Sequence, residues 1–199
     1  MLAMNRPALQ QLSEKPFFTV ADVARTLGIQ KESARVYCSR QVKAGLFLRL
    51  KKDFYVSANR WLNDDEKDFL VLANFLQVPS FCSLMTALSF HGITTQVQRN
   101  WHESVSVKRS ITYVAEGHEF HYHKLKKELY FGFDKINGVF MARPEKALVD
   151  ACHLASHGRY PRLDRESLNF DRLNPATAME MAALFPKRTQ TMVRDLCRI

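Results

Sequence analysis

The first sixty residues carry apolar stripes at helical spacing, interrupted by glycine. Apolar side chains recur at i, i+3, i+4 and i+7 over residues 20–27. Thr19 can cap this segment and Gly28 can end it, because glycine readily adopts the left-handed conformation of a sharp helix exit. A second helix is predicted from about Lys31 to Ala44, and it too is followed by glycine. This order of helix, glycine turn and helix is typical of a helix-turn-helix motif.

The next segment predicts a β-hairpin with a basic tip. Residues 46–56 alternate between apolar and polar positions on either side of a turn made by Lys51, Lys52 and Asp53. In a winged helix such a hairpin, the wing, follows the helix-turn-helix and lies over the DNA backbone or the minor groove. The sequence therefore predicts a winged helix-turn-helix domain at residues 1–60. An acidic and polar stretch that follows Val56 marks the expected boundary.

The distribution of charge supports a polyanionic partner for this domain. The chain has 29 Lys and Arg against 20 Asp and Glu, a net charge of +9. Residues 1–60 contain eleven basic and four acidic residues, whereas residues 61–199 contain 18 basic and 16 acidic residues. A positive field confined to one small region favours nucleic acid as the partner of that region. A winged helix that binds another protein is the alternative.

The outward face of the second predicted helix carries side chains suited to a major groove. Arg35 and Arg40 are the expected base readers, because a guanidinium can donate two hydrogen bonds to guanine, although both can also contact phosphates. The hairpin lysines are expected on the backbone or the minor groove. The predicted DNA-binding residues are Lys31, Ser33, Arg35, Ser39, Arg40 and Lys43 on the helix, and Lys51 and Lys52 on the hairpin.

Beyond residue 60 the pattern alternates between helical and strand periods. It predicts an α+β domain at residues 61–199, in which helices flank a mostly antiparallel sheet. The predicted helices are 63–77, 80–91, 145–157, 175–185 and 189–198, and the predicted strands are 103–107, 111–114, 119–123, 129–133 and 138–142.

Three segments of this second region resemble AbiEi-type antitoxins. Residues 79–92, PSFCSLMTALSFHG, are similar to the S-x-x-S-A-L-x-x-H-G segment of that family. Residues 129–132, LYFG, followed by 139–150, VFMARPEKALVD, resemble the A-x-P-E-K-A-L-L-D helix of that family. With the N-terminal winged helix, the resemblance covers most of residues 10–155.

The resemblance implies a cytoplasmic bacterial protein of a type IV toxin-antitoxin system with a role in phage defence. The N-terminal domain of such a protein binds inverted repeats in double-stranded DNA at its own promoter and represses its operon. The C-terminal domain counteracts a nucleotidyltransferase toxin, with no need for a stable complex. The alternative is a winged-helix regulator whose second domain binds a small ligand and that has no toxin partner.

The P-E-K-A-L-V-D run has two interpretations. In one it is a well-capped core helix, opened by Pro144, in which Lys146 and Asp150 pair across one turn for a few tenths of a kcal/mol. In the other, Glu145, Lys146 and Asp150 form a surface that acts on the toxin.

Enzymatic, metal and membrane functions find little support in the sequence. It has no P-loop, no dinucleotide fingerprint, and no Gly-Ser turn of the kind that a nucleotidyltransferase needs. His118, His121 and His123 are more consistent with packed strand residues than with a metal site, and the four cysteines are widely spaced. No apolar run reaches about 18 residues, and the N-terminus lacks the apolar core of a signal peptide. We therefore expect no cofactor, no metal, no membrane contact and no catalysis, with a nucleic-acid-processing enzyme as the least favoured alternative.

Overall fold

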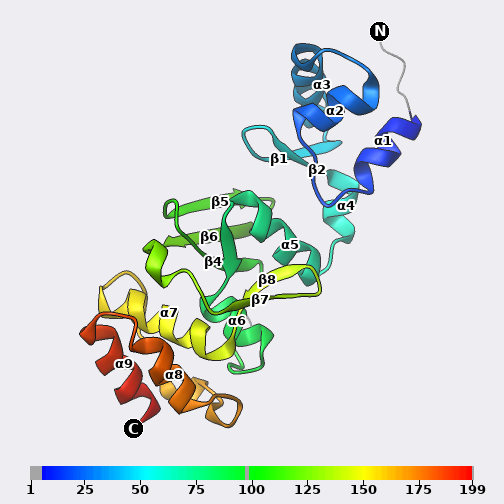
Figure 1. Cartoon of the computed structure of the whole chain (residues 1–199). Helices are drawn as coiled ribbons and strands as arrows, with labels where there is room; N and C mark the ends of the chain where they lie inside the picture. Colours follow the sequence, from blue (N-terminus) through cyan, green and yellow to red (C-terminus); the bar gives the residue numbers. More distant parts are fainter. Residues whose placement is uncertain (1–5, 97–98, 199) are drawn as a thin grey trace. The chain divides into compact units, whose positions relative to one another are not determined.

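The computed structural model describes residues 6–96 and 99–198 (Figure 1). These residues divide into two compact units. The first comprises the residues up to 72 together with 113–117, and the second comprises 73–112 and the residues from 118 on. The division falls within a helix, so it lies later in the chain than the predicted boundary between residues 60 and 61.

The N-terminal unit consists of short helices around a two-stranded antiparallel hairpin. The observed second and third helices agree closely with the two that the apolar spacing predicts. Phe18 forms an antiparallel bridge with Tyr55, so the segment before the second helix adds a third, very short strand position to the hairpin. The elements are α1 (Arg6–Ser13), α2 (Val20–Leu27), α3 (Lys31–Lys43), β1 (Phe47–Lys51), β2 (Phe54–Ser57) and α4 (Ala58–Asn63).

Local chemistry fixes both ends of α2. The Thr19 hydroxyl accepts a hydrogen bond from the backbone N–H of Asp22, whose carboxylate accepts one from the Thr19 N–H in return. Gly28 ends the helix with a φ of 64°, in the left-handed region. The small core beneath α2 and α3 is apolar, and it consists mainly of Leu12, Phe18, Val20, Val23, Ala34, Cys38, Phe47 and Tyr55.

The division between the two units falls within helix α5, and the second unit contains a six-stranded sheet except for residues 113–115 of its edge strand β5, which belong to the first unit. The strand order in that sheet is β5-β6-β4-β3-β8-β7. The elements of this part are α5 (Glu66–Leu76), β3 (Ser80–Cys82), α6 (Leu84–Phe90), β4 (Trp101–Ser106), β5 (Ile111–Ala115), β6 (His118–Lys124), β7 (Phe133–Ile136) and β8 (Val139–Ala142).

The sheet is mixed, which corrects the prediction of a mostly antiparallel sheet. β3 runs antiparallel to β4 but parallel to β8, and β4 runs parallel to β6. The parallel pair of β4 and β6 reflects the strand order. The chain passes from β4 to β5 at the outer edge of the sheet and then returns as β6, which lies between β5 and β4. The chain as a whole is therefore α+β with a mixed sheet.

Helix α7 is the centre of the second unit. It packs against α6, α8 and α9, and ten of its thirteen residues are buried. Figure 1 shows α7, α8 and α9 side by side. The remaining elements are η1 (Lys127–Leu129), α7 (Pro144–Ser156), η2 (Arg165–Ser167), η3 (Phe170–Arg172), α8 (Pro175–Ala182) and α9 (Lys187–Cys197).

Two predicted elements differ from the structure. Residues 80–82 form the buried strand β3 rather than the first turn of a helix, because they pair with both β4 and β8, and the helix begins only at Leu84. Of the predicted strand 129–133, only Phe133 lies in a strand, as the first residue of β7, and residues 129–132 do not form one. They leave a short 3₁₀ turn and pass through Gly132, whose φ is 74°, before β7 begins.

Every helix in the described part of the chain is too short or too polar to cross a membrane.

Candidate nucleic-acid interface

Helix α3 turns one face into the N-terminal core and the other to solvent. Ala34 and Cys38 are completely buried, and burial raises the pKa of the Cys38 thiol to about 11. Their burial fixes the rotation of the helix, so all six residues predicted to contact DNA lie on its exposed side. These exposed residues are Lys31, Ser33, Arg35, Ser39, Arg40 and Lys43.

The exposed face of α3 is basic, with an apolar position within it. Glu32 is the acidic residue of this face. No hydrogen bond or ion pair joins the guanidinium of Arg35 or Arg40 to another described residue. Val36 stands on the same face with half of its surface exposed. A face of this kind offers guanidinium donors for base edges and an aliphatic group that can contact a thymine methyl.

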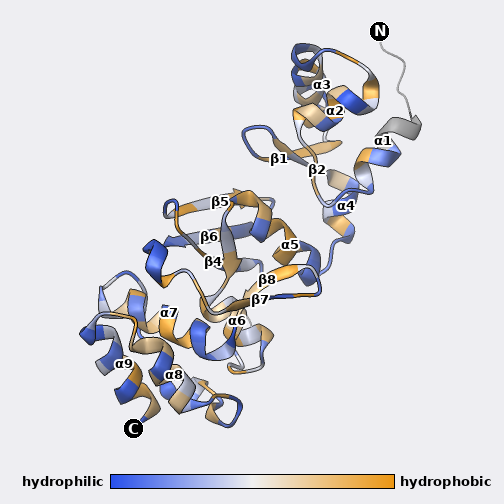
Figure 2. Ribbon diagram, viewed as in Figure 1, coloured by the Kyte–Doolittle hydropathy of each residue, from blue (hydrophilic) through white to orange (hydrophobic). Residues whose placement is uncertain are grey.

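The hairpin tip presents its two lysines differently. The Lys51 ammonium lies 5.0 Å from the centre of the Phe54 ring, and the lysine is half-buried, whereas Lys52 is exposed. The next residue, Asp53, has a φ of 60°, and its carboxylate accepts a hydrogen bond of 3.0 Å from the backbone N–H of Val20. This bond ties the turn of the hairpin to the start of α2. Figure 2 shows the hydrophilic character of both the tip and α3.

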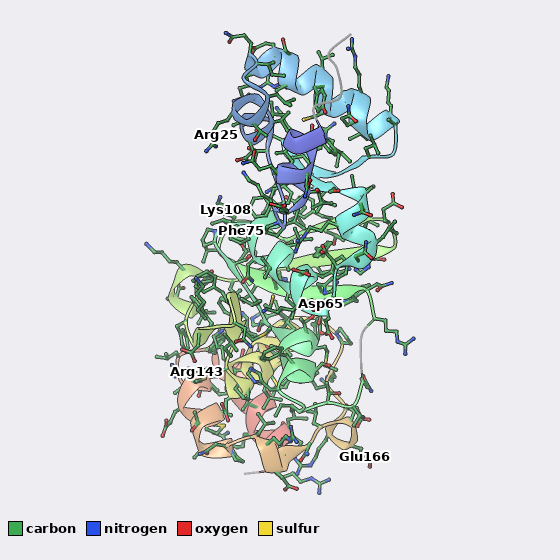
Figure 3. The ribbon with its side chains drawn as sticks, turned by 90° about the vertical axis from the view of Figure 1, so that its right-hand side faces the viewer. Arg25, Asp65, Phe75, Lys108, Arg143 and Glu166 are labelled. Carbon is green, nitrogen blue, oxygen red and sulfur yellow. The ribbon has the colours of Figure 1, made fainter. Side chains whose placement is uncertain are left out.

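Two further exposed basic residues of the N-terminal unit, on α2 and β1, were not among the predicted contacts. Arg25 projects outward from the last turn of α2 (Figure 3), and its side chain is 77% exposed although it lies 3.3 Å from the Asp22 carboxylate. Arg49 is exposed on β1. The signal for both was present in the sequence: Arg25 is polar against the apolar stripe of its helix, and Arg49 occupies an outward position of the alternating hairpin.

The predicted toxin-directed surface is wrong for two of its three residues. Lys146 and Asp150 pair as the i, i+4 spacing predicts, but both side chains are completely buried. The Ser83 hydroxyl donates a hydrogen bond of 2.8 Å to the Asp150 carboxylate. Glu145 is half-buried and accepts a hydrogen bond from the Asn174 N–H. The P-E-K-A-L-V-D run is thus the core helix of the other interpretation.

The histidines of β6 pack against their neighbours. The His121 ring stacks on Trp101 at 3.7 Å and lies 2.9 Å from the Glu119 carboxylate. Burial lowers the pKa of His123 to about 4. His118 lies 3.3 Å from His102. Among residues 6–96 and 99–198 there is no group of three or more His, Cys, Asp or Glu side chains placed to hold a metal ion.

Comparison with known proteins adds evidence on the fold. No family model matches the chain, and no curated protein matches its sequence. The crystal structure of the Rv2827c protein from Mycobacterium tuberculosis is similar to this one, with a TM-score of 0.61 and 10% sequence identity. The match covers 96% of this chain and 74% of that protein. At this identity the likeness shows a shared fold and nothing more.

Proposed function

We propose that this chain is a DNA-binding transcriptional repressor that also acts as the antitoxin of a type IV, AbiE-like system in the bacterial cytoplasm. The observation that carries the DNA-binding part is the solvent-exposed basic face of α3. This face lies on a helix whose rotation is fixed by two buried residues, and a hairpin tied to α2 follows it. We interpret this arrangement as a winged helix-turn-helix.

In this proposal α3 enters the major groove, which is about 12 Å wide and admits one helix. Arg35 and Arg40 read base edges, and the lysines and serines of α3 contact phosphates. Lys52 contacts the backbone beside the groove, while Lys51 is held against Phe54 and contributes mainly through its charge. Arg25 extends the phosphate contacts along α2. If about six phosphates are neutralised, log K falls with log salt concentration at a slope of about −5.

The antitoxin part of the proposal rests on the resemblance of residues 79–92, 129–132 and 139–150 to AbiEi-type proteins. Because Lys146 and Asp150 are buried, a toxin must contact other residues of the second unit. A second candidate function is a regulator whose second unit binds a small ligand. A cleft lined by arginines in that unit favours it.

A promoter reporter tests the repressor part in cells. The chain should lower expression from a reporter fused to the DNA upstream of its own gene. Arg35→Ala with Arg40→Ala should restore expression, because it removes both proposed base readers. Lys126→Ala with Lys127→Ala removes two exposed charges from the second unit and is the matched control that should still repress. Equal repression by both double variants would refute the assigned helix.

The antitoxin part has a separate test. Co-expression should restore the growth of cells that produce a nucleotidyltransferase encoded beside this gene. The Arg35→Ala, Arg40→Ala variant should still restore growth, because the proposed antitoxin activity lies in the second unit. A chain that represses the reporter but leaves growth arrested is a repressor without this antitoxin activity.

A further inference from the structure

The second unit contains a cleft of about 960 Å³ that neither the repressor nor the antitoxin proposal uses. One wall is the C-terminal end of α7, the other is α9, and residues 158–165 close one side. Helices α7 and α9 pack directly against each other beside it. The volume lies in the range of sites that hold a small molecule.

The charged side chains that line the cleft are mostly arginines. Arg162, Arg165, Arg188 and Arg198 line it, against one carboxylate, Asp195. The guanidinium of Arg165 donates to the Leu196 carbonyl and lies 4.2 Å from the centre of the Phe170 ring, so it is held in place. Arg162 and Arg188 are exposed and form no hydrogen bond or ion pair with any described residue. The planar guanidinium fork suits phosphate groups, to which it can donate two parallel hydrogen bonds.

Between these charges the cleft has an apolar surface. It is formed by Ala155, Leu163, Met192 and Leu196. On α9, the positions of Arg188, Met192 and Asp195 follow at i, i+4 and i+7, so they share one face. At 1.5 Å per residue they span about 10 Å along the helix axis. The cleft thus presents a cation, an apolar surface and a hydrogen-bond acceptor in succession along one helix.

We propose that this cleft binds a nucleotide. Arg188 and Arg162 hold its phosphates, the apolar surface of Met192 and Leu196 receives its base, and the Asp195 carboxylate accepts a hydrogen bond from an amino or hydroxyl group. An inorganic anion would interact with the arginines only. A nucleotide would interact with the arginines, the apolar surface and the Asp195 carboxylate at the same time. This proposal does not rest on DNA binding by α3, because every lining residue belongs to the second unit.

Calorimetric titration of the full chain tests the proposal. The probes are ATP, GTP, CTP and UTP, with pyrophosphate and citrate at the same ionic strength as anion controls. At least one nucleoside triphosphate should bind more tightly than pyrophosphate. Arg162→Gln with Arg188→Gln should weaken that binding by about a hundredfold, since each lost charge-assisted contact costs about tenfold.

Arg194→Gln is the matched control. It removes the same charge from α9, but Arg194 is exposed outside the cleft, so the affinity should stay within about twofold of the native value. Asp195→Asn should weaken nucleotide binding and leave pyrophosphate binding unchanged. Substitutions at exposed arginines should shift the melting temperature by no more than about 2 °C, which separates lost binding from lost folding.

Three results would overturn the proposal. The first is that no nucleotide binds more tightly than pyrophosphate at millimolar concentration. The second is equal weakening by the cleft variant and by Arg194→Gln, which would indicate a diffuse effect of charge. The third is nucleotide binding that the cleft variant does not weaken.

Discussion

The buried ion pair of α7 allows a quantitative test of how the second unit is held together. Both side chains, Lys146 and Asp150, have no exposed surface. Burial lowers the pKa of Lys146 and raises the pKa of Asp150, and their mutual attraction opposes both shifts. The lysine ammonium also lies 5.1–5.4 Å from the centres of three aromatic rings, which favours the charged form. These rings belong to Phe81, Phe131 and Phe185.

Removal of one partner leaves the other charge buried without compensation. We expect Lys146→Met to lower the free energy of unfolding by about 3–5 kcal/mol, the usual cost of breaking a buried pair. For a chain of this size that corresponds to a fall in melting temperature of about 6–20 °C. Lys146→Met with Asp150→Asn removes both charges and keeps an acceptor for the Ser83 hydroxyl. The double variant should therefore cost clearly less than the sum of the two single changes.

The assay is urea unfolding followed by fluorescence of Trp101, in a Trp61→Phe background that silences the other tryptophan. Trp101 lies on β4 of the second unit, so its signal reports that unit. A coupling energy of about 2 kcal/mol or more between the two positions supports the account. A cost below about 1 kcal/mol for Lys146→Met, or strict additivity in the double variant, would refute it.

His102 is buried and its pKa is lowered to about 4 from 6.5, so its contribution to stability is present above pH 6.5 and is lost as the pH falls toward about 4. Between pH 7.5 and 5, the free energy of unfolding of the His102→Phe variant should therefore fall less steeply than that of the native chain. Gly28→Ala should lower the free energy of unfolding, measured in urea, by about 1 kcal/mol, because a φ of 64° disfavours a residue with a side chain. Gly28→Asn should lower it less, since asparagine adopts this conformation more readily than alanine. Gly132→Ala should lower the melting temperature more than Gly28→Ala, because its methyl would meet the Lys146 side chain at 3.0 Å and its φ is 74°.

Local chemistry made the helices of the N-terminal unit predictable. The apolar stripe of α2, the Thr19 cap and the glycine exit are all determined by residues within one or two turns, and the structure confirms each of them. The rotation of α3 was equally predictable, because Ala34 and Cys38 are apolar positions on one side of a polar helix. The candidate DNA-binding residues follow from that rotation.

What depends on distant partners could not be predicted. Residues 80–82 have no strand signal of their own, and they form β3 because β4 and β8 flank them. The spacing of Lys146 and Asp150 predicts the pair but not its burial, because the aromatic rings around it come from residues 81, 131 and 185. The cleft beside α9 likewise combines residues from separate segments, so no local sequence motif predicts it.

A mobility-shift measurement shows whether the exposed face of α3 recognises a specific DNA sequence. The purified chain is titrated into a fragment from upstream of its own gene, with a scrambled fragment as competitor and the salt concentration varied. We expect a complex that survives the competitor and whose log K falls with log salt concentration at a slope of about −5. The specific complex should be lost in the Arg35→Ala, Arg40→Ala variant and kept in the Lys126→Ala, Lys127→Ala variant. Equal competition by the scrambled fragment, or an unchanged specific complex in the α3 variant, would contradict sequence-specific recognition by α3.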